Sequence, residues 1–204
     1  MKKFELTTEF ITNAFGKKLF RIKALVEFGD VKAGELGGYV EKEENVSQDG
    51  NAWVSGDAEV YGDAWVHGNA KVHGNAEVYG DTEVSGDALV YGNARVYGDA
   101  RVYGDARVSG NPWVSGNAWV YGDARVSGNV DYALVQGFGT EFRCTTFYRG
   151  KNKKIMVNCG CFHGNLEKFR KQVKETRSGK IAKEYLMIAD LMEYHFASED
   201  SRNE

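Results

Sequence analysis

Three cysteines and a histidine near the C-terminus are the residues best suited to chemistry. Cys159, Cys161 and His163 occupy alternate positions in the stretch CGCFH, and alternate residues of a β-strand share one face. A hairpin ahead of them would bring Cys144 opposite Cys159. Thiolates and imidazoles are common zinc ligands. These four residues are therefore a candidate metal set.

The same residues also fit a packed core. The hairpin follows from strand-like alternation in residues 142–148 and 154–161 around the turn RGKNK, with Arg149 opposite Lys154. Apolar residues share the face that carries the thiols, and the CxxC spacing of zinc knuckles is missing. Buried cysteine behaves as a small hydrophobe. We therefore expect core packing, with no metal and no other cofactor.

Two further histidines, His67 and His73, offer acid–base chemistry, because a neutral imidazole accepts a proton near neutral pH. Each follows the valine of a repeated unit, and in the sequence no acid is clearly placed to orient either ring. Their role depends on the architecture of the repeat.

The repeat runs from Gly50 to Ser127 as thirteen six-residue units of the form Gly-(Asn/Asp)-Ala-x-Val-(Ser/Tyr/His), without insertion. A fixed short period is typical of a solenoid. Ala and Val flank one variable residue, which predicts a short strand with Ala and Val inward and the variable residue outward. Gly-Asn and Gly-Asp supply the corners. Three units then form a triangular coil, and coils stack at about 4.8 Å.

The flanks predict end caps, because a solenoid exposes strand edges and open core at both ends. Residues 1–49 form an N-terminal β cap and an imperfect first coil, in which Val40 and Val46 anticipate the repeat. Residues 50–133 form the solenoid. Residues 134–204 form a small α+β (ββαα) unit with a frayed tail, its first helix capped by Asn165.

The run LFRIKAL…GDVKAGELGGYVEKEENVSQDGNAWV and the repeat after it resemble the hexapeptide-repeat, left-handed parallel β-helix family, in particular its YdcK-type and prophage-encoded members, over about residues 18–128. The resemblance implies a mainly β, three-faced solenoid of left hand. Members carry labels such as transferase or polymer-forming protein. In the acyltransferases of this family a histidine acts as general base beside acyl-CoA, in a cleft that a loop commonly builds. The repeat here has no such loop, so we expect His67 and His73 to be solvated corner residues.

The three faces differ in their outward residues, because every third unit stacks in one column. One column reads Glu59, Glu77, Arg95, Trp113, and another reads Trp65, Glu83, Arg101, Trp119. The third has no acid, and we name it the acid-free face: Trp53, Lys71, Leu89, Arg107 and Arg125, edged by His73 and Tyr91. Exposed aromatic residues and arginines are enriched at protein interfaces. We predict that this face binds a protein partner or a second copy, giving a dimer or trimer.

Charge and composition limit the other partners. A net charge of -3 excludes a globally basic nucleic-acid binder. A local basic patch leaves nucleic acid open for the C-terminal unit: Arg149, Lys151, Lys153, Lys154, Lys168, Arg170, Lys171 and Lys174. We expect no membrane partner, since no run approaches a membrane span. The charged start and the three cysteines predict the cytoplasm, of a host if a phage encodes the protein.

The predicted function is a non-enzymatic, prophage-type scaffold for binding or assembly through its flat faces. The first alternative is a trimeric acyltransferase that uses acyl-CoA. The second is a phage-encoded inhibitor or ligand sponge that acts on a host defence factor, and it depends on the prophage resemblance alone.

Overall fold

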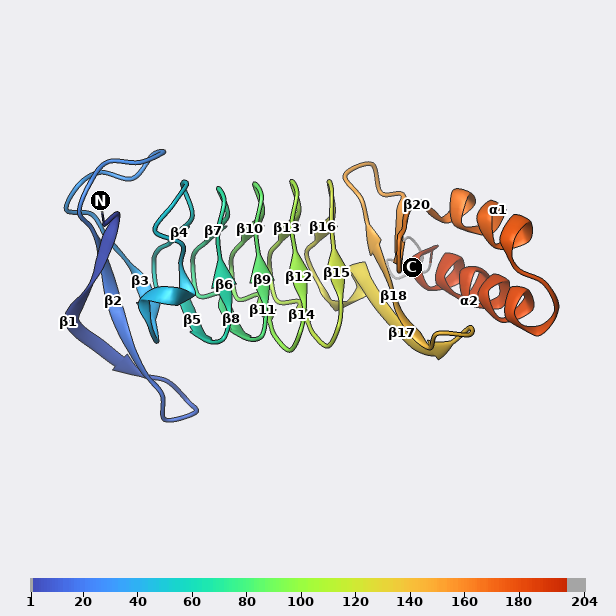
Figure 1. Ribbon diagram of the computed structural model, residues 1–204, viewed down its shortest axis with the longest axis horizontal. Coiled ribbons are helices and arrows are strands. Elements are labelled where there is room, and N and C mark those ends of the chain that lie inside the picture. The colour runs from blue at the N-terminus through green and yellow to red at the C-terminus, as the bar shows by residue number, and fades with distance from the viewer. Residues whose placement is uncertain (1, 198–204) are drawn as a thin grey trace, which may run out of the picture.

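The molecule is a rod with three parts in sequence order, as Figure 1 shows for this computed structural model. An antiparallel N-terminal hairpin, a stack of coils and a C-terminal α+β unit follow one another along the long axis. The structure describes residues 2–197. The predicted frayed tail lies outside them, apart from its first residue.

The coils form three parallel sheets, as predicted. The sheet that we name the hairpin face contains β5 (Glu59–Gly62), β8 (Glu77–Gly80), β11 (Arg95–Val96) and β14 (Trp113–Val114). The sheet that we name the Trp face contains β6 (Trp65–Val66), β9 (Glu83–Val84), β12 (Arg101–Val102) and β15 (Trp119–Val120). The acid-free face contains β4 (Trp53–Val54), β7 (Lys71–Val72), β10 (Leu89–Val90), β13 (Arg107–Val108) and β16 (Arg125–Val126).

The core follows the predicted register. Every repeat valine from Val54 to Val126 is fully buried, and the alanine two residues before it is buried as well. Thr82 and Pro112 replace that alanine in two units. The Thr82 hydroxyl donates to the Tyr79 carbonyl at 2.7 Å, so its burial leaves no unpaired polar group. Pro112 is tolerated because the amides that pair between coils belong to other positions of the unit.

The corners combine glycine with stacked amide side chains. The corner glycines have positive φ, +69° at Gly86 for example, a conformation that costs glycine little. Where asparagines stack, each amide donates to the residue one coil further on, as Asn75 does to Asn93 and Asn93 does to Asn111, both at 3.0 Å. These ladders connect the coils outside the backbone pairing.

The N-terminal segment extends one sheet and closes the first coil. β1 (Phe4–Thr12) and β2 (Lys18–Ala24) form an antiparallel hairpin, and β3 (Leu36–Val40) joins it to the hairpin face. Val40 pairs with Val60 and Val46 with Val66, as the sequence predicted. The short helix η1 (Glu43–Asn45) places the Asn45 amide on the Gly62 and Ala64 carbonyls. The first strand edge is therefore paired.

Lys3 is buried in this cap, and its pKa gives a prediction. Its ammonium donates to the Ala52 carbonyl at 2.9 Å and lies 4.7 Å from the centroid of the Phe28 ring. Burial lowers the pKa of Lys3 from 10.5 to about 8, while Asp49 acts in the opposite direction. Between these two values the unfolded chain holds a proton that the folded protein has released, so folding becomes more favourable as the pH rises.

We expect the unfolding free energy of the wild type, measured by urea denaturation, to increase relative to that of Lys3→Met as the pH is raised from 8 to 10.5. The contributions of groups that titrate in both proteins cancel in the difference between the two unfolding free energies. A difference that does not change with pH would contradict the burial of a lysine with a lowered pKa.

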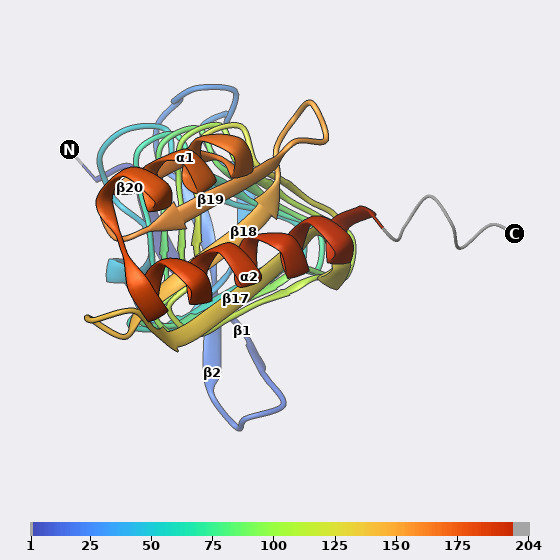
Figure 2. The same cartoon turned by 90° about the vertical axis from the view of Figure 1, so that its right-hand side faces the viewer.

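The C-terminal unit is an antiparallel sheet covered by two helices. Its strands are β17 (Tyr132–Phe138), β18 (Arg143–Arg149), β19 (Ile155–Cys159) and β20 (Phe162–Asn165), after the short helix η2 (Asn129–Asp131). The helices α1 (Leu166–Thr176) and α2 (Gly179–Ala197) lie on the side away from the coils (Figure 2). The predicted α+β unit is confirmed, with β17 and β20 as additional strands. The Asn165 side chain accepts from the Lys168 amide, as predicted for the N-cap.

Side chains of this unit satisfy the edge of the last coil. Thr146 and Tyr132 supply hydroxyl oxygens that accept from the amides of Trp119 and Ser115. Tyr148 is fully buried against the end of the solenoid core. The C-terminal unit thus joins the coils by side-chain hydrogen bonds, by apolar packing and by one backbone bridge, in which the Lys151 amide donates to the Asp123 carbonyl at 3.0 Å.

Candidate functional site

The candidate metal set of Cys144, Cys159, Cys161 and His163 is not assembled. Cys159 pairs with Thr145, not with Cys144, because the hairpin pairs Arg149 with Ile155 and its turn is one residue longer than expected. A shift of one residue moves side chains to the opposite face of a strand. Cys161 lies in the turn between β19 and β20. Within residues 2–197 no cluster of three or more His, Cys, Asp or Glu side chains is arranged to hold a metal ion.

His163 instead belongs to the junction between the coils and the C-terminal sheet. Its Nδ1 lies 2.7 Å from Asn158 Oδ1, and its ring packs edge-on against Tyr121. The Asn158 amide in turn donates to the Trp119 carbonyl at 2.9 Å. Burial lowers the pKa of His163, and Asp123 opposes this effect. A neutral ring fits a structural role here.

His67 has an acidic partner, which corrects the prediction that no acid orients it. Its Nε2 lies 2.9 Å from a Glu83 carboxylate oxygen. Trp65 stacks on the imidazole with ring centroids 3.8 Å apart. The repeat contained the information for this contact. Because a coil has 18 residues, Glu83 lies one coil above Trp65 and therefore diagonally across from His67. The contacts hold the ring in place beside the Trp face.

His73 is a corner residue that stacks on Tyr91, with ring centroids 5.0 Å apart and nearly parallel planes. Partial burial lowers its pKa, and the charge of Lys71 acts in the same direction. No acidic partner of His73 is present in the described part of the chain.

The acid-free face is partly covered, which corrects the expectation that Trp53 is exposed. Trp53 is only 3% exposed, because Phe4 and Phe28 of the N-terminal segment pack edge-on against its ring. Asp30 from the same segment forms an ion pair with Lys71. The face therefore receives its acid from outside the repeat.

Further along this face, three predicted binding residues remain at the surface. Leu89 pairs with Arg107, and Arg107 pairs with Arg125, in the register that the sequence predicted. The guanidinium of Arg125 donates to the Asp105 and Ala124 carbonyls, so its charge is directed at the backbone of the coils. On this face Arg107 is exposed, whereas Leu89 and Arg125 are half-buried.

The Trp face is the more open surface. Trp65 and Trp119 lie at its two ends and are 46% and 37% exposed. Between them Glu83 and Arg101 are adjacent, with charged atoms 3.8 Å apart. The Arg101 guanidinium also lies over the Trp119 ring at 5.4 Å. This face carries the aromatic and arginine composition that was predicted for the acid-free face.

The predicted basic patch is divided between structural and exposed residues. Arg149 is largely buried and lies 3.1 Å from Asp131, where it joins the sheet to the last coil. Arg170 pairs with Asp190 and Glu193 of α2. The lysines remain exposed in two groups, on the β18–β19 turn and on the outer side of α1: Lys151, Lys153, Lys154, Lys168, Lys171 and Lys174.

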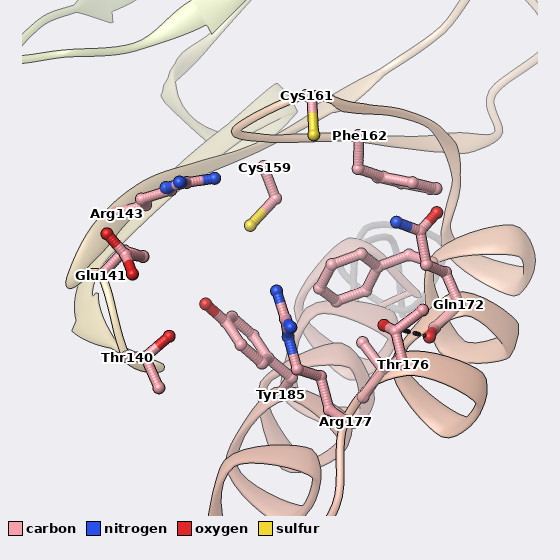
Figure 3. A pocket seen from close by; sticks show the side chains of 12 residues that line it. Thr140, Glu141, Arg143, Cys159, Cys161, Phe162, Gln172, Thr176, Arg177 and Tyr185 are labelled. Atoms are coloured by element: carbon pink, nitrogen blue, oxygen red, sulfur yellow. Dashed lines mark hydrogen bonds between the residues drawn. The ribbon is translucent and has the colours of Figure 1, made fainter.

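A pocket that the sequence did not predict lies between the C-terminal sheet and the two helices (Figure 3). It encloses about 600 Å³, its open mouth included. Side chains from the sheet, the turn after α1 and α2 point into it: Arg143, Cys159, Phe162, Arg177 and Tyr185. Residues more than 30 positions apart meet here, so local patterns gave no signal for the pocket.

These observations define the class of protein: a three-faced parallel β-solenoid that ends in an antiparallel hairpin at one end and an α+β unit at the other. A family model described as YdcK Beta solenoid repeat matches residues 83–98, 90–101 and 100–116. The coils over these residues are therefore similar to YdcK-type β-solenoid repeats. A search of curated proteins found no match. Neither helix within residues 2–197 is long and apolar enough to cross a membrane.

Proposed function

We propose that this protein is a non-enzymatic assembly scaffold that pairs with a second copy of itself through the Trp face. The observation that supports this is the order of its outward residues along the rod. Trp65 is followed by Glu83, then Arg101, then Trp119, each one rung from the next. This order is the same from either end, except that the acid and the base exchange places.

Such a surface is complementary to itself about a two-fold axis. If the axis runs along the strands between β9 and β12, the two rods are antiparallel. Glu83 then faces Arg101 of the second copy, and Trp65 faces Trp119. Parallel rods would instead place each charge against its own kind, which opposes association. The charge order therefore selects one arrangement.

The size of the Trp face determines how tightly the two copies are expected to associate. Its two tryptophans are three rungs apart, about 14 Å at the usual strand spacing. A surface of this size is small for a permanent dimer and fits a weak, reversible one. We expect a monomer–dimer equilibrium that shifts with protein concentration.

Charge reversal tests the arrangement. We expect Glu83→Arg and Arg101→Glu each to be monomeric in sedimentation equilibrium, at concentrations where the wild type dimerises. An equal mixture of the two variants should dimerise again, because each supplies the charge that the other lacks. Exposed ion pairs contribute little to folding, so thermal unfolding should change only slightly in either variant.

Tryptophan substitution supplies a matched control. Trp119→Ser should weaken the dimer. Trp113→Ser should not, because Trp113 is an exposed tryptophan (51%) on a different face, the hairpin face. A wild type that stays monomeric at every concentration, or a mixture that fails to recover the dimer, would overturn the proposal.

A further inference from the structure

The pocket of the C-terminal unit is lined by two arginines. Arg143 begins β18, and Arg177 caps the end of α1. Neither guanidinium has an ion-pair partner among the residues that the structure describes. Glu141 is an acid at the rim, but it forms no ion pair with Arg143. Two arginines directed at one space favour an anion there.

The rest of the lining is suited to a ligand with an apolar part. The ring centroids of Phe162 and Phe169 lie 5.5 Å apart. The Phe169 ring packs edge-on against the Tyr185 ring, with centroids 5.9 Å apart. The Tyr185 hydroxyl donates to the Phe138 carbonyl at 3.4 Å, which holds its ring in the lining of the pocket. Burial raises the pKa of Tyr185, and Cys159 acts in the same direction through its charge and a hydrogen bond. Arg177 and Arg143 act in the opposite direction, so both guanidinium charges act on this part of the pocket.

The backbone at the rim is strained. Phe142, between Glu141 and Arg143, has a φ of +49° and a ring that is 66% exposed. A bulky residue in the left-handed region costs free energy and is more common near binding sites than elsewhere. The strained turn fixes Arg143 and Glu141 at the mouth of the pocket.

We propose that this pocket binds a small molecule with an oxyanion, phosphate or carboxylate, attached to an aromatic body. Arg143 and Arg177 hold the oxyanion, and the ring rests on Phe162. This site goes beyond the proposed assembly function, because it is on the end unit and not on the Trp face.

Four probes separate the contributions in isothermal titration calorimetry: phenyl phosphate, benzoate, inorganic phosphate and phenol. We expect phenyl phosphate or benzoate to bind, and the stronger of the two identifies the anion. Inorganic phosphate should bind more weakly, because it lacks the ring, and phenol should not bind. Equal binding of all anions, or none at millimolar concentration, would overturn the proposal.

Variants locate the site. Arg143→Gln and Arg177→Gln should each weaken binding about tenfold, the usual loss for one charged hydrogen bond. Arg107→Gln makes the same change of charge on the acid-free face and should leave the affinity unchanged. Glu141→Gln should strengthen binding, because it removes the acid at the rim. If Arg107→Gln weakens binding as much as Arg143→Gln does, the ions bind by general charge and the site is wrong.

The cysteines give an independent readout. Cys159 lines the pocket, and Cys144 lies outside it. The bound probe should slow alkylation of Cys159 by iodoacetamide and leave that of Cys144 unchanged, as measured by mass spectrometry of peptides. Protection of both thiols or of neither would count against the site.

Discussion

Val90→Asp is expected to cost about 4 kcal/mol of folding free energy or to prevent folding, because it buries a carboxylate with no partner. Val90 is fully buried and lies between Val72 and Val108 of the neighbouring coils. Each coil depends on the two beside it, so the damage does not stay local. Circular dichroism during thermal unfolding measures the loss.

Leu89→Asp is the matched control. Leu89 precedes Val90 on the same strand but points outward, between Lys71 and Arg107. A carboxylate there remains in solvent beside two cations, so the melting temperature should stay the same or rise. Equal losses in the two variants would mean that the inward and outward assignments are wrong.

Gly86→Ala is expected to be a strongly damaging corner substitution, because two effects add. Gly86 has a φ of +69°, and a Cβ there would lie 2.8 Å from the Gly104 amide nitrogen of the next coil. Alanine in the left-handed region costs about 1–2 kcal/mol, and the clash adds the cost of separating two coils, about 1–3 kcal/mol.

Gly116→Ala separates these two effects. Gly116 has a similar φ of +62°, but a Cβ there meets nothing within 4 Å. It should therefore show the conformational cost alone in urea denaturation. If Gly86→Ala and Gly116→Ala are equally destabilising, the spacing between coils is not what limits the corner to glycine.

The solenoid was predictable because its information is local. The valines of the repeat, the alternation around them and the glycine corners all recur within six residues, and each has a direct physical cause. Even the pairing of Glu83 with Arg101 follows once the coil length is known. The sequence also carried the contact of His67 with Glu83, which a search along columns alone does not find.

The functional surfaces were less predictable because they depend on contacts between distant segments. Nothing in the repeat indicates that Phe28 and Asp30 cover part of the acid-free face. The one-residue change in the hairpin turn likewise decided whether Cys144 and Cys159 meet. Turn length and loop placement follow from tertiary packing, and the pocket that holds Arg143 and Arg177 arises from both.

The number of repeat units also fixes the angular phase between the two ends of the rod. Three units complete a coil, so inserting three would lengthen the molecule by about 4.8 Å and keep both ends in the same orientation. Inserting a single unit would advance every later residue by one side of the triangle. The C-terminal pocket would then open toward a different side relative to the N-terminal hairpin. Duplication within such a sequence therefore preserves the spatial relation of the ends only when whole coils are gained or lost.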